Sequence, residues 1–243
     1  GGGGGSGGVG GGVGGGSGGG GDGGEQLIRR VVPADNSCLF VAVALALEGG
    51  EKGGEKGGEE GGGRGRAAAL REVVARAVLA DPERFSEAVL GRPPEEYARW
   101  IRDPEHWGGG IELAVLAEHY RTELGAVDCQ TQRVDLFGQG RGFSERVLLI
   151  YDGVHYDLLA RTPFAGAPPE FDLRVFPCSD EAVMASVMAE AAALARRAQQ
   201  AGKFTDTARF TLRCLVCQCG LTGQAEAVAH AKASGHTNFS EFK

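Results

Sequence analysis

Hydrophobic and polar positions follow a helical period in the first half of the chain and a strand-like pattern in the second half. The segment Leu27–Val32 has short-strand character and ends at Pro33. The run Cys38–Leu47 is apolar on every face, so it predicts a central helix surrounded by the core. Amphipathic spacing predicts three further helices, at Arg66–Leu79, Pro94–Arg102 and Ile111–Leu124.

From Gly125 onward the pattern changes to short β-rich segments separated by turns that contain glycine. The predicted strands are Ala126–Gln130, Arg133–Phe137, Glu145–Tyr151 and Val154–Leu159. Asp152-Gly153 is a strong hairpin signal, and we expect the strands to form a meander. Helices followed by a meander predict an α+β domain over residues 27–176, with a small central sheet flanked by helices. The alanine-rich, helix-period stretch that follows predicts a linker helix over residues 177–204.

Glycine is concentrated in two tracts. Of the 43 glycines, 19 fall within residues 1–24 and 10 within residues 49–65. Glycine-rich segments cannot repay their ordering entropy by burial, so we expect a disordered tail over residues 1–26 and a surface loop over residues 49–65. The longest apolar run, Leu39–Leu47, is too short to span a bilayer, and no signal-peptide pattern is seen. We therefore expect no membrane insertion.

Charge and cysteine content narrow the function classes. The chain carries 25 Lys and Arg against 32 Asp and Glu, a net charge of −7, which argues against a dedicated nucleic-acid binder. The six cysteines are unevenly spaced and do not form a disulfide framework. Three of them, Cys214, Cys217 and Cys219, lie close together, which suggests metal chemistry in a reducing compartment. We expect a cytoplasmic location.

Cys38 follows Asp35-Asn36-Ser37 at the point where a loop becomes a helix. A helix N-terminus favours a thiolate, and its free backbone N–H groups could hold an oxyanion. A small apolar residue at the start of a buried helix explains Cys38 equally well, and for a single cysteine this second interpretation is the commoner one.

A thiolate nucleophile needs a base, and His155 is the best-placed histidine. It follows the Asp152-Gly153 turn, and Asp157 lies two residues further on, on the same face of an extended strand. Asp157 could therefore fix the imidazole tautomer as the third member of a triad. An ordinary pair at a hairpin edge has the same spacing. His119 lies on an apolar stripe and is expected to be packed, and nothing supports a role for His106.

The C-terminal residues 205–243 have the ligand spacing of a single tetrahedral zinc site. The pattern is Cys214-x2-Cys217-x12-His230-x5-His236, with a preceding strand and a helix over Gly223–Gly235, which predicts a small ββα zinc finger. So short a module needs a metal to supply its folding energy. Cys219 is less well spaced and is treated as a bystander. Because the finger has few basic side chains, we expect it to bind protein and not nucleic acid.

Three motifs in a fixed order carry a resemblance to a known family. The first is Pro33-Ala34-Asp35-Asn36-Ser37-Cys38-Leu39-Phe40, and the second is Trp107-Gly108-Gly109-Gly110-Ile111-Glu112-Leu113. The third is the segment Arg146–Asp157, which ends in Tyr151-Asp152-Gly153-Val154-His155-Tyr156-Asp157. Together they resemble the ovarian-tumour (OTU) deubiquitinases, which have a papain-like cysteine protease fold. More narrowly, the chain is similar to the subfamily that works with the Cdc48/p97 segregase in ER-associated degradation. The similarity covers residues 27–242 except the second glycine tract, and it includes the finger.

The resemblance implies a role for each matching position. Cys38 corresponds to the nucleophile, His155 to the general base, and Asp157 to the acid that orients the histidine. Asp35 corresponds to the loop aspartate whose surrounding backbone helps to form the oxyanion hole. The implied activity is hydrolysis at the ubiquitin C-terminus, with ubiquitin and polyubiquitin chains as partners and a structural zinc that catalysis does not need.

Three further expectations follow from the residues around these motifs. The Trp107 turn either forms one wall of a channel for the ubiquitin tail or anchors the next helix in the core, and Glu112 is expected to be structural. A catalytically silent ubiquitin-binding adaptor on the same fold is the alternative to an enzyme. Animal and yeast relatives begin with a ubiquitin-like docking domain where this sequence has a glycine-rich tail, which leaves recruitment of Cdc48/p97 open.

Overall fold

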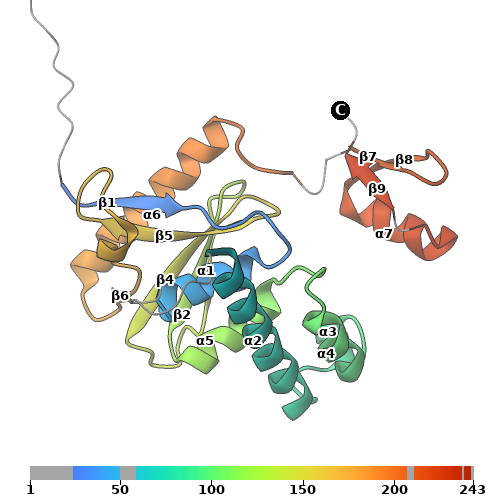
Figure 1. Ribbon diagram of the computed structural model, residues 1–243, viewed down its shortest axis with the longest axis horizontal. Coiled ribbons are helices and arrows are strands. Elements are labelled where there is room, and N and C mark those ends of the chain that lie inside the picture. Colours follow the sequence, from blue (N-terminus) through green and yellow to red (C-terminus); the bar gives the residue numbers. More distant parts are fainter. Residues whose placement is uncertain (1–23, 50–58, 207–210, 237, 242–243) are drawn as a thin grey trace, which may run out of the picture.

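The computed structural model describes residues 24–49, 59–206, 211–236 and 238–241 (Figure 1). Its helices are α1 (Cys38–Leu47), α2 (Glu59–Ala80), α3 (Glu87–Leu90), α4 (Pro94–Arg102), α5 (Gly110–Tyr120), α6 (Glu181–Gln200) and α7 (Gly223–Ser234), with a 3-10 turn, η1, at Pro169–Phe171. Its strands are β1 (Gln26–Arg30), β2 (Glu123–Asp128), β3 (Val134–Phe137), β4 (Glu145–Tyr151), β5 (Tyr156–Thr162), β6 (Phe176–Pro177), β7 (Thr211–Cys214), β8 (Gly220–Thr222) and β9 (Phe239–Glu241). The predicted α+β class, with a central sheet and a small C-terminal module, is confirmed. The predicted tail lies almost entirely outside the described residues, as does part of the second glycine tract.

The main sheet has the order β1-β5-β4-β2-β3, with β6 paired to β4. β4 and β5 form the predicted hairpin, but β2 and β4 are parallel, with Glu123 opposite Arg146. The expected meander is therefore wrong, because the chain leaves β3 at the edge of the sheet and returns on the other side of β2. Alternation along a strand indicates which residues face the core, but it does not determine which edges pair.

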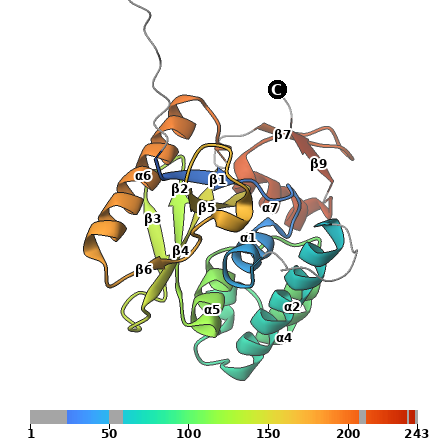
Figure 2. The same ribbon diagram turned by 60° about the vertical axis from the view of Figure 1, so that its left-hand side comes forward.

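Each face of this sheet is covered by helices. Leu124, Val147 and Leu158 point to the face covered by α1, α2, α4 and α5. Val127, Leu148 and Leu159 point to the opposite face, which α6 covers, and Figure 2 shows these two layers on either side of the strands. Because alternate residues of each strand point to opposite faces of the sheet, the strands contribute apolar side chains to the core on both faces.

The helix expected within residues 177–204 is α6, and it packs against the main sheet. Val187, Ala191 and Ala195 are fully buried on one stripe of α6. These small side chains let the helix approach the sheet closely, and α6 shields apolar side chains that water would otherwise reach.

Local hydrophobic patterning predicted α1, α4 and β4 with the bounds that the structure has. α1 is buried as expected, with Phe40, Ala42 and Val43 fully inaccessible to solvent. No helix in the described ranges is long and apolar enough to cross a membrane.

Two helix boundaries differ from the prediction. α2 begins at Glu59, so the end of the expected 49–65 loop is helical. Extending a packed helix costs less than starting one, and a Cβ added at Gly63 would come within 3.9 Å of Val41 in α1, so this turn of α2 lies close to α1. α5 ends at Tyr120 and not at residue 124, because Arg121 adopts a left-handed conformation with φ of 54°.

The C-terminal module is a three-stranded sheet of order β8-β7-β9 with α7. The predicted ββα unit is present, and β9 adds a third strand after the helix. Gly235 closes α7 in the left-handed conformation that glycine favours, with φ of 74°.

Candidate active site and metal centre

Cys38 is the first residue of α1 and is 5% exposed. The turn before it is shaped by Asp35, whose Oδ1 accepts a hydrogen bond of 2.9 Å from the Ser37 amide and whose carbonyl accepts one of 3.3 Å from the Cys38 amide. The amide of Asn36 has no hydrogen-bond acceptor in the described part of the chain. Asp35 therefore holds a tight turn in which one amide is left as a donor beside the start of the helix.

Burial controls the protonation of the Cys38 thiol. It raises the pKa of Cys38 above the ordinary value, and the carboxylates of Asp35 and Asp157 raise it further. The backbone N–H groups of Tyr156 and Leu39 lower this pKa, but by less. Desolvation and nearby negative charge thus oppose the preference for a thiolate expected at a helix N-terminus.

His155 lies directly before β5, in a turn that Asp152 holds. The Oδ1 atom of Asp152 accepts hydrogen bonds of 2.9 Å from the His155 amide and 3.3 Å from the Val154 amide. Thr205 donates from its amide to the Asp152 carbonyl at 2.6 Å, and a Cβ added at Gly153 would lie 2.0 Å from the Thr205 carbonyl oxygen. The position of His155 is thus fixed from both sides of the turn.

The structure brings His155 and Asp157 together, as their spacing predicted. The Nε2 atom of His155 lies 2.9 Å from Asp157 Oδ1, and Asp157 is fully buried. Oδ1 also accepts a 2.8 Å hydrogen bond from the Val32 amide, and Arg29 donates to Oδ2. A buried carboxylate with three donors is held in one orientation, so it fixes the imidazole in turn.

Cys38 begins α1 and His155 directly precedes β5, and these two elements pack against each other. The backbone N–H of Tyr156, the residue after His155, acts on the Cys38 thiol. Because Asp157 occupies Nε2 of His155, Nδ1 is the ring nitrogen left for a proton from the thiol. The nucleophile, base and acid expected from the sequence therefore come from two neighbouring element ends.

The Trp107 turn lies beside the nucleophile turn. Trp107 is 53% exposed and donates from Nε1 to Asn36 Oδ1, so it is not a core anchor. A Cβ added at Gly108 would come 3.0 Å from the Phe40 ring, so glycine permits the close approach of this turn to α1. The core-anchor role considered for Trp107 is therefore wrong, and its role in a channel wall stays a prediction.

Glu112 is structural, as expected. Its carboxylate is buried and accepts hydrogen bonds from the Tyr97 hydroxyl and, at 2.6 Å, from the Gly109 amide. Burial raises the pKa of Glu112. His119 is exposed and edge-on to Tyr120, which contradicts the expectation that it is packed.

Two arginines at the site were missed from the sequence. Arg29 joins Asp157 to Asp152, which it contacts at 3.3 Å. Arg71 is buried beside the turn that precedes Cys38. Its position on the apolar stripe of a helix, one residue after Leu70, was a signal that a charged side chain there is buried.

The predicted metal ligands converge in the C-terminal module. One ligand atom from each of Cys214, Cys217, His230 and His236 lies within 4.8 Å of all the others. The Nδ1 atom of His236 is buried and has no hydrogen-bond partner among the described residues. Two sulfur and two nitrogen donors at this spacing fit a tetrahedral zinc ion. Cys219 is exposed and is outside this cluster in the described part of the module.

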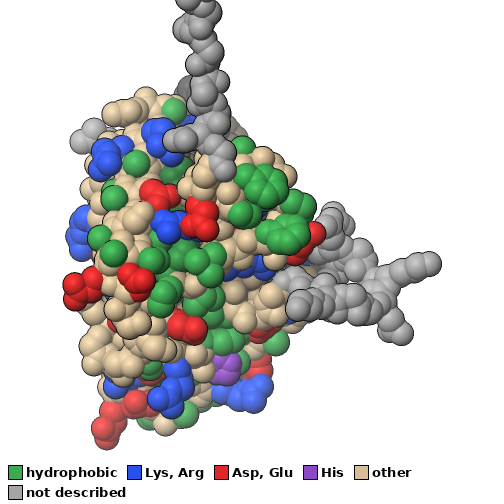
Figure 3. All heavy atoms as spheres, turned by 90° about the vertical axis from the view of Figure 1, so that its left-hand side faces the viewer, with side chains coloured by type: hydrophobic (Ala, Val, Ile, Leu, Met, Phe, Trp, Pro, Cys, Tyr) green, Lys and Arg blue, Asp and Glu red, His purple; other side chains and the backbone are tan. Residues whose placement is uncertain are grey.

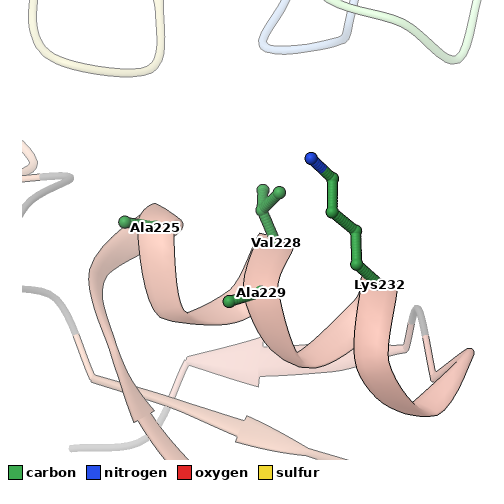
Figure 4. Close-up of a pocket in the computed structure, with 4 residues that line it drawn as sticks. All are labelled: Ala225, Val228, Ala229 and Lys232. Carbon is green, nitrogen blue, oxygen red and sulfur yellow. The ribbon is translucent and has the colours of Figure 1, made fainter.

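One face of α7 is apolar apart from one lysine. Figure 4 shows Ala225, Val228, Ala229 and Lys232 along this helix, where they line a shallow hollow of about 540 Å³. This face of α7 carries a single basic side chain, and the absence of nucleic-acid binding stays a prediction. Figure 3 shows acidic, basic and hydrophobic side chains interspersed on another face of the molecule, without a continuous basic stripe.

Comparisons with known proteins agree with these features. Residues 208–242 match the family model described as "Ubiquitin thioesterase OTU1, C-terminal C2H2-type zinc finger". The chain is 46% identical over 217 residues to "OVARIAN TUMOR DOMAIN-containing deubiquitinating enzyme 2" of Arabidopsis thaliana, covering 89% of this chain and 98% of that protein. It is 50% identical over 216 residues to "Ubiquitin thioesterase OTU1" of Gallus gallus, covering 88% of this chain but 66% of that protein.

A solved structure shares the arrangement of the larger domain. The match, entitled "Structure of Ovarian Tumor (OTU) domain in complex with Ubiquitin", has a TM-score of 0.62 at 27% identity. It covers 74% of this chain and 91% of the solved one.

Proposed function

Because this chain belongs to the family of ovarian-tumour-domain deubiquitinating enzymes, we propose that it hydrolyses isopeptide and thioester bonds at the C-terminus of ubiquitin by cysteine catalysis. The observation that carries the proposal is the 2.9 Å contact between His155 Nε2 and the buried Asp157, next to the amide that acts on the Cys38 thiol. Cys38 is the nucleophile, His155 the general base, Asp157 the residue that orients it, and Asp35 the residue that shapes the oxyanion turn.

The chemistry follows from the protonation of the resting site. Since the pKa of Cys38 is raised, His155 takes the thiol proton as the sulfur attacks the scissile carbonyl. The tetrahedral oxyanion accepts a hydrogen bond from the Asn36 backbone amide of the Asp35 turn. The imidazolium then protonates the leaving amine, and a water molecule activated by His155 hydrolyses the acyl-enzyme.

We propose that Cys214, Cys217, His230 and His236 hold a structural zinc ion. When bound, the ion cross-links β7 to the end of α7 and supplies folding energy. No step of the hydrolysis uses it. The corresponding division of the chain is a tail that ends before β1, a catalytic domain that begins with β1, and a zinc finger over residues 205–243.

The cellular role is proposed from the same relationship. We place the protein in ubiquitin-dependent quality control of ER proteins, acting on ubiquitin and polyubiquitin chains, with Cdc48/p97 as a candidate partner. The cytosol is the proposed location because reduced cysteines are required at both sites. The alternative function is a silent ubiquitin-binding adaptor on the same fold.

The proposal is tested with ubiquitin that carries a thiol-reactive electrophile at its C-terminus, followed by intact mass. We expect one ubiquitin adduct on the wild type, no adduct on Cys38→Ala, and an unchanged adduct on the control Cys178→Ala. Cys178 is partly exposed and contacts Glu123 away from the site.

The same variants separate an enzyme from an adaptor. Cys38→Ala is expected to bind ubiquitin while losing turnover of a fluorogenic ubiquitin amide. A folded, reduced wild type that forms no adduct and shows no turnover would favour the adaptor.

A further inference from the structure

Arg71 on α2 is the most deeply buried cationic side chain at the site, with 1% of its surface exposed. Within the described ranges it forms no ion pair with a carboxylate, and its Nε atom has no hydrogen-bond partner. Burial lowers the pKa of Arg71, as expected for a cation removed from water. Such a placement is costly, so its contacts indicate what it stabilises.

The guanidinium joins two loops that carry no regular structure. One Nη atom donates to the Asn36 carbonyl at 2.9 Å, to Ser37 Oγ at 3.2 Å and to the His106 carbonyl at 2.7 Å. The other donates to the carbonyls of Ile101 and Asp103, at 3.0 and 3.2 Å. The first loop leads directly into Cys38, and the second leads into Trp107.

Arg71 also touches the helix that bears the nucleophile. Its guanidinium carbon lies 4.3 Å from the centre of the Phe40 ring in α1. The planar fork of arginine can serve carbonyls from two loops and stack on an aromatic ring at once, which a lysine ammonium cannot. These contacts therefore require the arginine side chain, and another buried positive charge would not make all of them.

Holding the Asn36 carbonyl fixes the plane of the Asn36–Ser37 peptide, because peptide groups are rigid. The N–H of that peptide, on Ser37, donates to Asp35 Oδ1 at 2.9 Å, so its orientation helps to set the turn from which the Asn36 amide faces the proposed oxyanion hole. On the opposite side, Asn36 is tied to Trp107 and, at 3.4 Å, to Glu105. Arg71 thus sets the separation between the nucleophile turn and the Trp107 turn.

We propose that Arg71 is a positioning residue for the hydrolysis, holding the turn before Cys38 in the conformation that presents the Asn36 amide to the tetrahedral oxyanion. The inference rests on the proposed function. It goes beyond a structural role, because it assigns to Arg71 an effect on one chemical step.

The test compares Arg71→Lys and Arg71→Met with the control Arg161→Met. Arg161 is also largely buried, donates to Ser186 Oγ at 3.1 Å and pairs with Glu190 between β5 and α6. For each full-length variant we would measure the melting temperature, kcat and KM on a fluorogenic ubiquitin amide, and the rate of Cys38 alkylation by iodoacetamide. Alkylation forms no oxyanion, so it reports access to the thiol alone.

We expect Arg71→Met to lose about 100-fold or more in kcat, the range for a lost oxyanion donor, with KM and alkylation within about threefold of the wild type. Arg71→Lys is expected to fold and to lose about tenfold, since its ammonium group cannot bridge both loops. If Arg71→Met fails to fold, Arg71→Lys alone decides the outcome. Arg161→Met is expected to lose stability but to keep its kcat.

Two results would overturn the inference: a kcat that falls only in step with alkylation and the folded fraction, or Arg71 variants with wild-type kcat. A wild-type protein that forms no adduct and shows no turnover is a different result, because it removes the proposed hydrolase itself.

Discussion

At the scale of single residues, two opposing influences act on the sulfur of Cys38. The start of a helix favours a thiolate, whereas removal from water favours the neutral thiol. The side chain is 5% exposed, and burial together with Asp35 and Asp157 raises its pKa. His155 therefore has a proton to remove before the sulfur can attack.

This balance predicts how the free protein reacts with small electrophiles. Only the thiolate is alkylated, and its fraction grows as the pH approaches the pKa from below. Because the pKa of Cys38 is raised, its alkylation by iodoacetamide should still be rising above about pH 8.5, the value for an ordinary thiol. Intact-mass time courses, with Cys38→Ala as background, would measure this profile. A rate that is already maximal near neutral pH would instead indicate a preformed thiolate.

The sequence predicted the parts of the site that depend on neighbours along the chain. His155 and Asp157 share a strand face because they are two residues apart. Asp35 lies in the turn that leads directly into Cys38. Arg29 reaches Asp157 only because β1 pairs with β5. Contacts of this kind follow from strand pairing, which no local pattern encodes.

At the scale of elements, boundaries set by side-chain patterns were predictable and those set by the backbone were not. The apolar run that begins at Cys38 gave α1 its bounds. The end of α5 depends on Arg121 in a left-handed conformation, which is uncommon for a residue other than glycine and leaves no mark in the hydrophobic pattern. The parallel pairing of β2 with β4 is likewise a property of the assembled sheet.

The β4–β5 turn offers a prediction at this scale. Gly153 has φ of +106°, and a Cβ there would lie 2.0 Å from the Thr205 carbonyl oxygen. Gly153→Ala should therefore lower stability by about 1–3 kcal/mol through backbone strain and displace His155, which lowers kcat. Urea unfolding and steady-state kinetics would measure both effects.

Gly166 supplies the matched control for that substitution. It also has a positive φ, +81°, but a Cβ there would meet no atom within 4 Å. Gly166→Ala should show the strain without the collision and should keep its kcat. If the two variants were equally active, the contact with Thr205 would have no part in placing the histidine.

At the scale of the whole molecule, the two sheets are stabilised by different means. The main sheet has apolar side chains buried on both faces. In the described part of the C-terminal module the fully or nearly buried apolar side chains are those of Cys214 and Ala227. A core this small cannot hold the module together without a metal.

Metal removal should therefore separate the two parts. A strong chelator is expected to remove about one zinc ion per chain and to unfold the finger, while the rate of adduct formation at Cys38 stays the same. Metal analysis, circular dichroism and the ubiquitin electrophile would follow this. His236→Ala should reproduce the effect, and His119→Ala, at an exposed histidine of the larger domain, should not. If the chelated protein formed no ubiquitin adduct while its larger domain stayed folded, the conclusion that catalysis does not need the zinc ion would be wrong.

The contact between Arg29 and Asp157 has a consequence for the order of events during synthesis. These residues are 128 positions apart, and β1, which precedes β5 along the chain, joins the sheet only by pairing with β5. Chains emerge from the ribosome N-terminus first, and long-range strand pairs form slowly. β1 must therefore wait, unpaired, until β5 has been made. The carboxylate that orients His155 acquires its full set of donors only then, so hydrolytic competence arises late in the life of the nascent chain.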